Sequence, residues 1–156
     1  MPRGRSLSGR SGCALRDQGG GCYRTSRSGR DEARYRPGVS SPVETDVENG
    51  VVCVPSTPFA SALVLSGSSG RSDVERARLL ARHGVAALAL RYFGGIGQPS
   101  GLCEIPLETF YTAVDTLAQI HPRVVLIGVS KGAEAALSVA ATDSRVSLVV
   151  AIAPRL

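Results

Sequence analysis

Short apolar runs alternate with amphipathic stretches from Gly50 to the end of the chain. The runs are nearly continuous and rich in Val, Ala and Leu, which is typical of strands buried on both faces. They cover residues 51–54, 61–65, 85–90, 124–127 and 147–152. Helical spacing of apolar residues between the runs predicts helices over residues 72–83, 107–119 and 131–141. The pattern therefore predicts an α/β fold, with a mostly parallel sheet covered by helices on both faces.

Punctuating residues give the expected helix boundaries. Ser72 followed by Glu75 matches a capping box, so the first helix is expected to begin at Ser72 and to end before Gly84. Pro106 is expected to open the second helix. Regular structure as a whole is expected to begin at Gly50, with residues 37–49 as a polar connector.

The first 36 residues do not share the alternating pattern. They hold nine arginines against three acidic residues, a net +6, whereas the whole chain of 156 residues is +5. This Gly-, Ser- and Arg-rich composition predicts a disordered basic tail ahead of one domain over residues 50–156. Positive charge alone could contact phosphates, but no aromatic platform or recognition motif accompanies it, so we do not expect nucleic-acid binding.

Composition also limits cofactors and location. No apolar run is long enough to span a membrane, and the N-terminal region lacks the apolar core of a secretory signal. The four cysteines, Cys13, Cys22, Cys53 and Cys103, lack metal-site spacing, so neither a metal nor a cofactor is expected. The same spacing gives no disulfide framework, which predicts a cytoplasmic location.

One five-residue motif carries candidate chemistry. Residues 128–132, Gly-Val-Ser-Lys-Gly, match G-x-S-x-G directly between a predicted strand and a predicted helix. A nucleophile elbow requires this strand–turn–helix setting. The motif therefore predicts an α/β-hydrolase fold with Ser130 as its catalytic nucleophile. Gly128 and Gly132 are needed because side chains there would collide with the neighbouring strand or helix. Two alternatives are that Ser130 only caps the helix, or that the turn binds phosphate, although the phosphate-loop spacing is missing.

A second loop supports the elbow. Residues 67–70, Gly-Ser-Ser-Gly, also follow an apolar strand and precede a helix. Hydrolases place there the loop that supplies one backbone N–H of the oxyanion hole. We therefore predict the N–H groups of Ser68, Ser69 and Lys131 as oxyanion donors.

Longer stretches around these motifs carry a family resemblance. The chain resembles the C-terminal catalytic domain of the acyl-CoA thioester hydrolase and bile-acid-CoA:amino-acid N-acyltransferase family over about residues 50–154. The matching stretches are residues 65–70, 78–94, 104–110, 113–115 and 127–134. The resemblance implies an acyl-CoA or related acyl-ester substrate. In that family the hydrolases carry Ser at the elbow and the N-acyltransferases carry Cys, so Ser130 implies hydrolysis.

The acid and the base of a triad are not evident. Only Glu134 and Asp143 are acidic after Ser130, and no histidine follows it. We therefore expect a partial α/β-hydrolase fold, a fragment with little activity alone, and the exposed edge at residues 146–152 also favours self-association. A catalytically inactive binding module and a dienelactone-hydrolase-like esterase stay open as alternatives.

Overall fold

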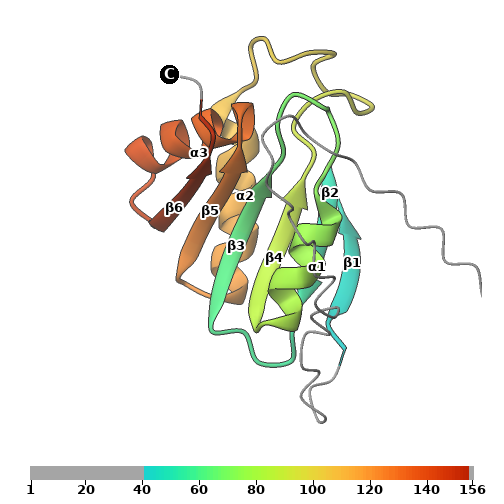
Figure 1. Cartoon of the computed structure of the whole chain (residues 1–156), viewed down its shortest axis with the longest axis vertical. Helices are drawn as coiled ribbons and strands as arrows, with labels where there is room; N and C mark the ends of the chain where they lie inside the picture. The colour runs from blue at the N-terminus through green and yellow to red at the C-terminus, as the bar shows by residue number, and fades with distance from the viewer. Residues whose placement is uncertain (1–40, 155–156) are drawn as a thin grey trace, which may run out of the picture. The chain divides into compact units, whose positions relative to one another are not determined.

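The computed structural model describes residues 41–154, which form one sheet with three helices (Figure 1). The strand order is β1-β2-β4-β3-β5-β6. The strands are β1 (Val43–Val47), β2 (Gly50–Val54), β3 (Ala60–Leu65), β4 (Val85–Leu90), β5 (Val124–Val129) and β6 (Val146–Ile152). Strands β3 to β6 are parallel, and β1 and β2 are antiparallel to their neighbours, so the predicted mostly parallel sheet is confirmed.

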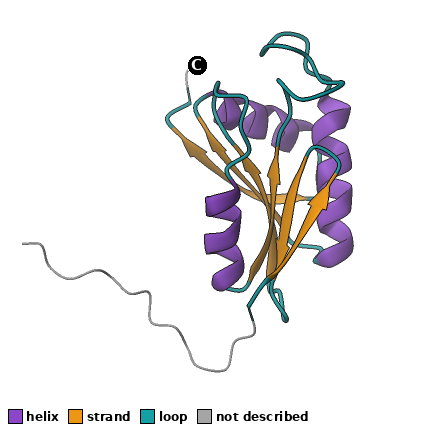
Figure 2. Ribbon diagram, turned by 90° about the vertical axis from the view of Figure 1, so that its right-hand side faces the viewer, coloured by secondary structure: helices purple, strands orange, loops and turns teal. Residues whose placement is uncertain are grey.

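Helices cover both faces of this sheet, as the pattern predicts (Figure 2). Alternate residues of a strand point to opposite faces. On β3, Leu63 and Leu65 therefore pack with the helices α2 (Leu107–Ile120) and α3 (Lys131–Thr142). Ala62 and Val64 face the helix α1 (Val74–Arg82) in a core built mostly of alanines and valines. These small residues let α1 lie close to the sheet.

The boundaries differ from prediction at two places near the start of the domain. Strand β1 lies inside the segment expected as a connector, so the prediction that regular structure begins at Gly50 is wrong. Most of β1 is exposed, and it is held by pairing with β2 and by the ion pair from Glu44 to Arg78 at 2.7 Å. Residues 1–36, for which the sequence predicts a basic tail, lie outside the described residues.

The first helix begins later than its sequence suggests. The cap of α1 is Asp73 and not Ser72, because the Asp73 carboxylate accepts a hydrogen bond from Arg76 N at 3.2 Å. The capping-box prediction at Ser72 is therefore wrong. All the predicted strands and helices are confirmed to within two residues at their starts and ends, and α1 begins two residues later than predicted.

The last strand is an edge strand, as expected. Leu148, Val150 and Ile152 are exposed along β6, which has β5 as its neighbour on one side. Because β3, β4, β5 and β6 run parallel, their carboxyl ends lie at the same edge of the sheet. That edge, called here the carboxyl edge, carries the turns that follow each of these strands.

Candidate active site

Ser130 occupies a strained turn between β5 and α3. Its backbone angles are φ 52° and ψ −117°, in a region that residues with a side chain rarely adopt. Its N–H donates to Ile152 O at 2.8 Å, which ties the turn to the end of β6. The Ser130 hydroxyl makes no capping hydrogen bond to α3. The structure therefore does not support the alternative that Ser130 is an ordinary helix cap.

The two glycines of the motif sit where backbone segments touch. A Cβ at Gly128 would overlap the Gly132 carbonyl, and a Cβ at Gly132 would overlap the Ser66 carbonyl. Both obstacles are main-chain atoms, which cannot move aside as a flexible side chain would. The steric reason predicted for glycine at these two positions is therefore confirmed.

The loop after β3 lies directly beside this turn. Strands β3 and β5 are neighbours with Leu65 opposite Gly128, so the chain leaves both strands at the same level of the carboxyl edge. A Cβ at Gly67 would be 3.4 Å from the Ser130 Cβ. The predicted donors in this loop were Ser68 and Ser69 and did not include Gly67, although a glycine two residues after a buried strand was a usable signal.

Backbone N–H groups are free on both sides of Ser130. Among the contacts of residues 41–154, the amides of Gly67, Ser68 and Ser69 have no hydrogen-bond acceptor, and neither has Lys131 N–H. A helix N-terminus leaves such donors unsatisfied and carries partial positive charge. Lys131 N–H and the Gly67–Ser69 amides therefore form a candidate anion-binding corner at the carboxyl edge.

Acidic and basic side chains near the turn pair with each other. Lys131 Nζ forms an ion pair with Glu134 Oε2 at 2.7 Å, one helical turn into α3. The other carboxylate oxygen, Oε1, is buried and has no partner among the described residues. The Glu134 carboxylate therefore binds Lys131 and makes no hydrogen bond to the Ser130 hydroxyl, whereas Glu134 N–H donates to Ser130 O at 3.2 Å as part of the first turn of α3.

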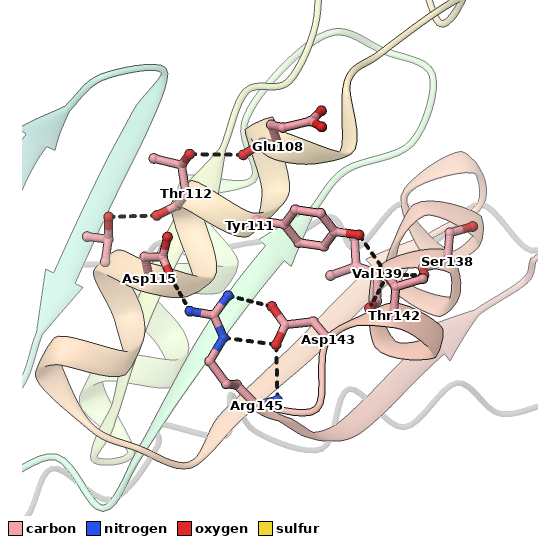
Figure 3. A network of polar contacts seen from close by, with 10 residues as sticks. Glu108, Tyr111, Thr112, Asp115, Ser138, Val139, Thr142, Asp143 and Arg145 are labelled. Carbon is pink, nitrogen blue, oxygen red and sulfur yellow. Dashed lines mark hydrogen bonds and ion pairs between the residues drawn. The ribbon is translucent and has the colours of Figure 1, made fainter.

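The remaining acid after Ser130 lies at the opposite edge of the sheet. Asp143 follows α3 and pairs with Arg145, with Oδ2 2.6 Å from Nη2 (Figure 3). Arg145 also reaches Asp115 of α2. The Arg145 guanidinium holds the pKa of Asp143 below its ordinary value, although burial acts in the raising direction. This network joins α2, α3 and β6 and is remote from the elbow.

Both histidines also lie at the edge of the sheet where the parallel strands begin, called here the amino edge. His83 follows α1 and precedes β4, and His121 follows α2 and precedes β5. The His121 Nδ1 accepts a hydrogen bond from Arg123 N at 3.1 Å. Strand β5 separates His121 from Ser130, so among the described residues no histidine contacts the candidate nucleophile.

Other kinds of site are not evident in residues 41–154. This part of the chain has no cluster of three His, Cys, Asp or Glu side chains that could hold a metal ion. None of its helices is long and apolar enough to cross a membrane. A hollow of about 380 Å³ lies against β1, β2 and α1 and is lined by Glu44, Asp46 and Arg78 among others. The hollow therefore lies at the β1 side of the sheet, and β6 forms the other side.

Comparison with solved structures defines the class of fold. A dienelactone hydrolase-like promiscuous phosphotriesterase from metagenomic libraries superposes with a TM-score of 0.59 at 22% identity, covering 74% of this chain and 59% of that chain. Dienelactone hydrolase from Anabaena variabilis gives a TM-score of 0.57 at 23% identity, over 70% of this chain and 62% of that chain. The fold is that of the α/β-hydrolases.

Sequence comparison with curated proteins gives closer relatives. Acyl-coenzyme A thioesterase 6 of Homo sapiens is 41% identical over 113 residues, 67% of this chain and 27% of that protein. Acyl-coenzyme A amino acid N-acyltransferase 1 of Mus musculus is 39% identical over 100 residues, 61% of this chain and 24% of that protein. The chain thus spans about a quarter of the length of these relatives. No protein-family model matches it. The resemblance to acyl-CoA thioesterases and N-acyltransferases predicted from the sequence is confirmed.

Proposed function

We propose that this chain carries the nucleophile and the oxyanion donors of a serine hydrolase acting on acyl-CoA thioesters or related acyl esters. The observation that supports this most is the Ser130 turn, which is strained at positive φ. Its hydroxyl makes no cap bond, and the amides beside it have no acceptor within residues 41–154. Strain held at a strand-to-helix turn costs stability, and such strain is concentrated at functional sites. The thioesterases and N-acyltransferases among its relatives favour an acyl-CoA substrate.

The proposed chemistry is acyl transfer in two steps. Ser130 Oγ attacks the carbonyl carbon of the acyl group, the Oγ–C bond forms, and the hydroxyl proton passes to a base. The carbonyl oxygen becomes an oxyanion that accepts hydrogen bonds from Lys131 N–H and from the amides after β3. Collapse of this intermediate breaks the C–S bond, and coenzyme A leaves as the thiol after taking up the proton. Water then attacks the acyl carbon and gives up a proton to the base, the Oγ–C bond breaks, Ser130 Oγ takes that proton back, and the carboxylic acid leaves.

The supply of a base determines how fast this happens. A serine hydroxyl is a weak nucleophile without one, and His83 and His121 both lie at the amino edge. Oxyanion donors alone preserve only a small part of the catalysis of a full triad. We therefore propose that the chain by itself acylates Ser130 slowly, over hours and not seconds.

The decisive experiment follows covalent modification of Ser130. We expect the full chain, incubated with a fluorophosphonate probe or with an acyl-CoA, to gain one phosphonyl or acyl group, mapped by peptide mass spectrometry to Ser130. Ser130→Ala should abolish the adduct. Ser138→Ala is the matched control, because Ser138 lies on the same helix and its hydroxyl donates only to Glu134 O. That variant should react like the wild type.

Two results would contradict the proposal. One is an adduct that persists in Ser130→Ala, which would place the reactive group elsewhere. The other is a folded wild type that binds acyl-CoA but is modified by neither reagent, which would favour the inactive binding module instead. Transfer of the acyl group to glycine in preference to water would keep the nucleophile but replace hydrolysis by N-acyl transfer.

A further inference from the structure

We infer that Tyr92 is a positioning residue that holds the loop of residues 66–70, here called the oxyanion loop, in the geometry that acylation of Ser130 requires. This inference rests on the proposed function and names a residue that acts through the loop and does not touch the substrate. Tyr92 comes two residues after β4, which is the other neighbour of β3 in the sheet.

The Tyr92 side chain is fixed by its surroundings. It is buried to 2% exposure, and its ring lies 5.2 Å from that of Phe93 and 5.3 Å from that of Phe110. Aromatic rings packed at these separations stabilise the fold by more than the apolar area they bury would account for. The hydroxyl therefore has little freedom, and it donates to Ser66 O at 2.6 Å.

That hydrogen bond orients the peptide group next to the nucleophile. The carbonyl of Ser66 and the N–H of Gly67 belong to one planar trans peptide and point in opposite directions. Fixing the carbonyl therefore also fixes Gly67 N–H, and Gly67 is the loop residue packed against Ser130. The same carbonyl also packs against Gly132, so a small rotation of this peptide would disturb both the oxyanion loop and the first turn of α3.

The neighbours of Tyr92 hold the far end of the loop. Arg91 Nε donates to Gly70 O at 2.9 Å. The Phe93 ring packs on Gly70, where a Cβ would lie 3.2 Å from Cε2, and Gly70 itself has φ +65°. Three consecutive residues after β4 thus contact both ends of the oxyanion loop, whose middle amides are left free.

The tyrosine hydroxyl also remains a donor at ordinary pH. Burial, with a smaller contribution from the Glu134 charge, raises the pKa of Tyr92 to about 12. The hydroxyl is therefore protonated throughout the range in which a hydrolase is assayed. Only removal of the oxygen eliminates the hydrogen bond, which makes Tyr92→Phe the informative substitution.

A matched control is present on α2. The Tyr111 hydroxyl pairs with Thr142 Oγ1 at 2.8 Å, far from the elbow and close to the Asp143 network (Figure 3). Tyr111→Phe removes one tyrosine hydrogen bond of similar length, and it leaves the oxyanion loop untouched. Any general effect of losing a hydroxyl should therefore be seen in both variants.

The test measures fluorophosphonate labelling of Ser130 and, by 15N relaxation, the backbone order parameters of the oxyanion loop in the full chain. For Tyr92→Phe we expect the limiting labelling rate constant to fall about 10-fold, because displaced oxyanion donors cost rate. The half-saturating probe concentration should stay unchanged. The order parameters of the Gly67, Ser68 and Ser69 amides should fall from the rigid range near about 0.85 toward about 0.6, since the Ser66–Gly67 peptide loses the hydrogen bond that fixes it. Tyr111→Phe should change the labelling rate constant by less than about 2-fold and leave the order parameters unchanged. Urea unfolding confirms that both variants are folded under assay conditions.

Each outcome decides one claim. A reactive wild type with an unchanged rate in Tyr92→Phe overturns this inference and leaves the proposed function intact, as does equal slowing in Tyr111→Phe. A wild type unreactive at Ser130 overturns the proposed function. In that event the order parameters alone decide whether Tyr92 holds the loop, and unchanged order parameters in Tyr92→Phe overturn that claim.

Discussion

The helices α1 and α3 each begin at the carboxyl edge after a neighbouring strand of the sheet, and their first turns are built differently. At α1 the Asp73 carboxylate accepts from Arg76 N and pairs with the Arg76 guanidinium at 3.2 Å. At α3 the corresponding residue, Ser130, sits at positive φ and makes no cap bond. The second helical position is the well-exposed Glu75 in α1 and the tightly enclosed Gly132 in α3.

The difference separates a structural helix start from one with free chemistry. The start of α1 satisfies Arg76 N–H through the side chain of its own cap, Asp73. The start of α3 has no side-chain cap bond, strains Ser130 and requires glycine at position 132. These features cost stability, and they bring a hydroxyl and free amides together at one point. The same contrast holds within α3, since its far end at Asp143 is fully paired with Arg145.

The largest expected effect comes from filling the first turn of α3. Gly132→Ala would push a methyl group against the Ser66 and Leu65 carbonyls, which belong to the end of β3 and the oxyanion loop. We expect the free energy of unfolding to fall by about 3 kcal/mol or more, measured by urea denaturation.

Gly101→Ala is the control for that substitution. No atom lies within 4 Å of a Cβ at Gly101, so its unfolding free energy should change by less than about 0.5 kcal/mol. Equal effects of the two substitutions would mean that the close approach at Gly132 is not a constraint on the fold. The difference between the two ends of α3 would then need another explanation.

A smaller effect is expected at the paired end of α3, and it depends on pH. Hydrogen bonds from Arg145 hold the pKa of Asp143 below its ordinary value. A depressed folded-state pKa stabilises the protein above the unfolded-state pKa, and this stabilisation is lost as the pH falls through the folded-state value. We expect Asp143→Asn to lower the unfolding free energy by about 1–2 kcal/mol at pH 7.

The pH profile provides the control for Asp143. The difference between wild type and Asp143→Asn should shrink as the pH is lowered from about 5 to about 2, because the wild-type carboxyl then becomes protonated. Urea unfolding at several pH values measures it. A difference that stays constant over this range would show that the loss at pH 7 is not the loss of the charged pair.

Much of this arrangement could be predicted from the sequence because the buried strands have a dense apolar pattern. The runs at 61–65, 85–90 and 124–127 are too short and too continuously apolar to be anything but buried strands. The elbow motif falls between a clear strand and a clear helix. Strand β1 was missed because its Glu44-Thr45-Asp46 centre is exposed, so pairing with β2 and not burial makes it a strand.

The support of the oxyanion loop could not be predicted in the same way. Tyr92 and Ser66 are 26 residues apart, and their contact depends on β3 and β4 being neighbours in register. Periodicity reports which face a residue occupies and not which residues meet across strands. The start of α1 was missed for a local reason, since Ser72 and Asp73 are both good caps and only geometry selects between them.

The smallest expected effect tests the opening comparison itself. Asp73→Ala should lower the unfolding free energy by about 1 kcal/mol, because it removes a cap that satisfies Arg76 N. Ser130→Ala should change it by less than about 0.5 kcal/mol, since no cap bond is lost and the strained backbone is retained. Ser72→Ala should match Ser130→Ala and not Asp73→Ala. Urea denaturation of the three variants in one buffer resolves these values if the slopes agree. If Ser130→Ala cost as much as Asp73→Ala, Ser130 would be acting as a helix cap, and the free hydroxyl on which its proposed role depends would be lost.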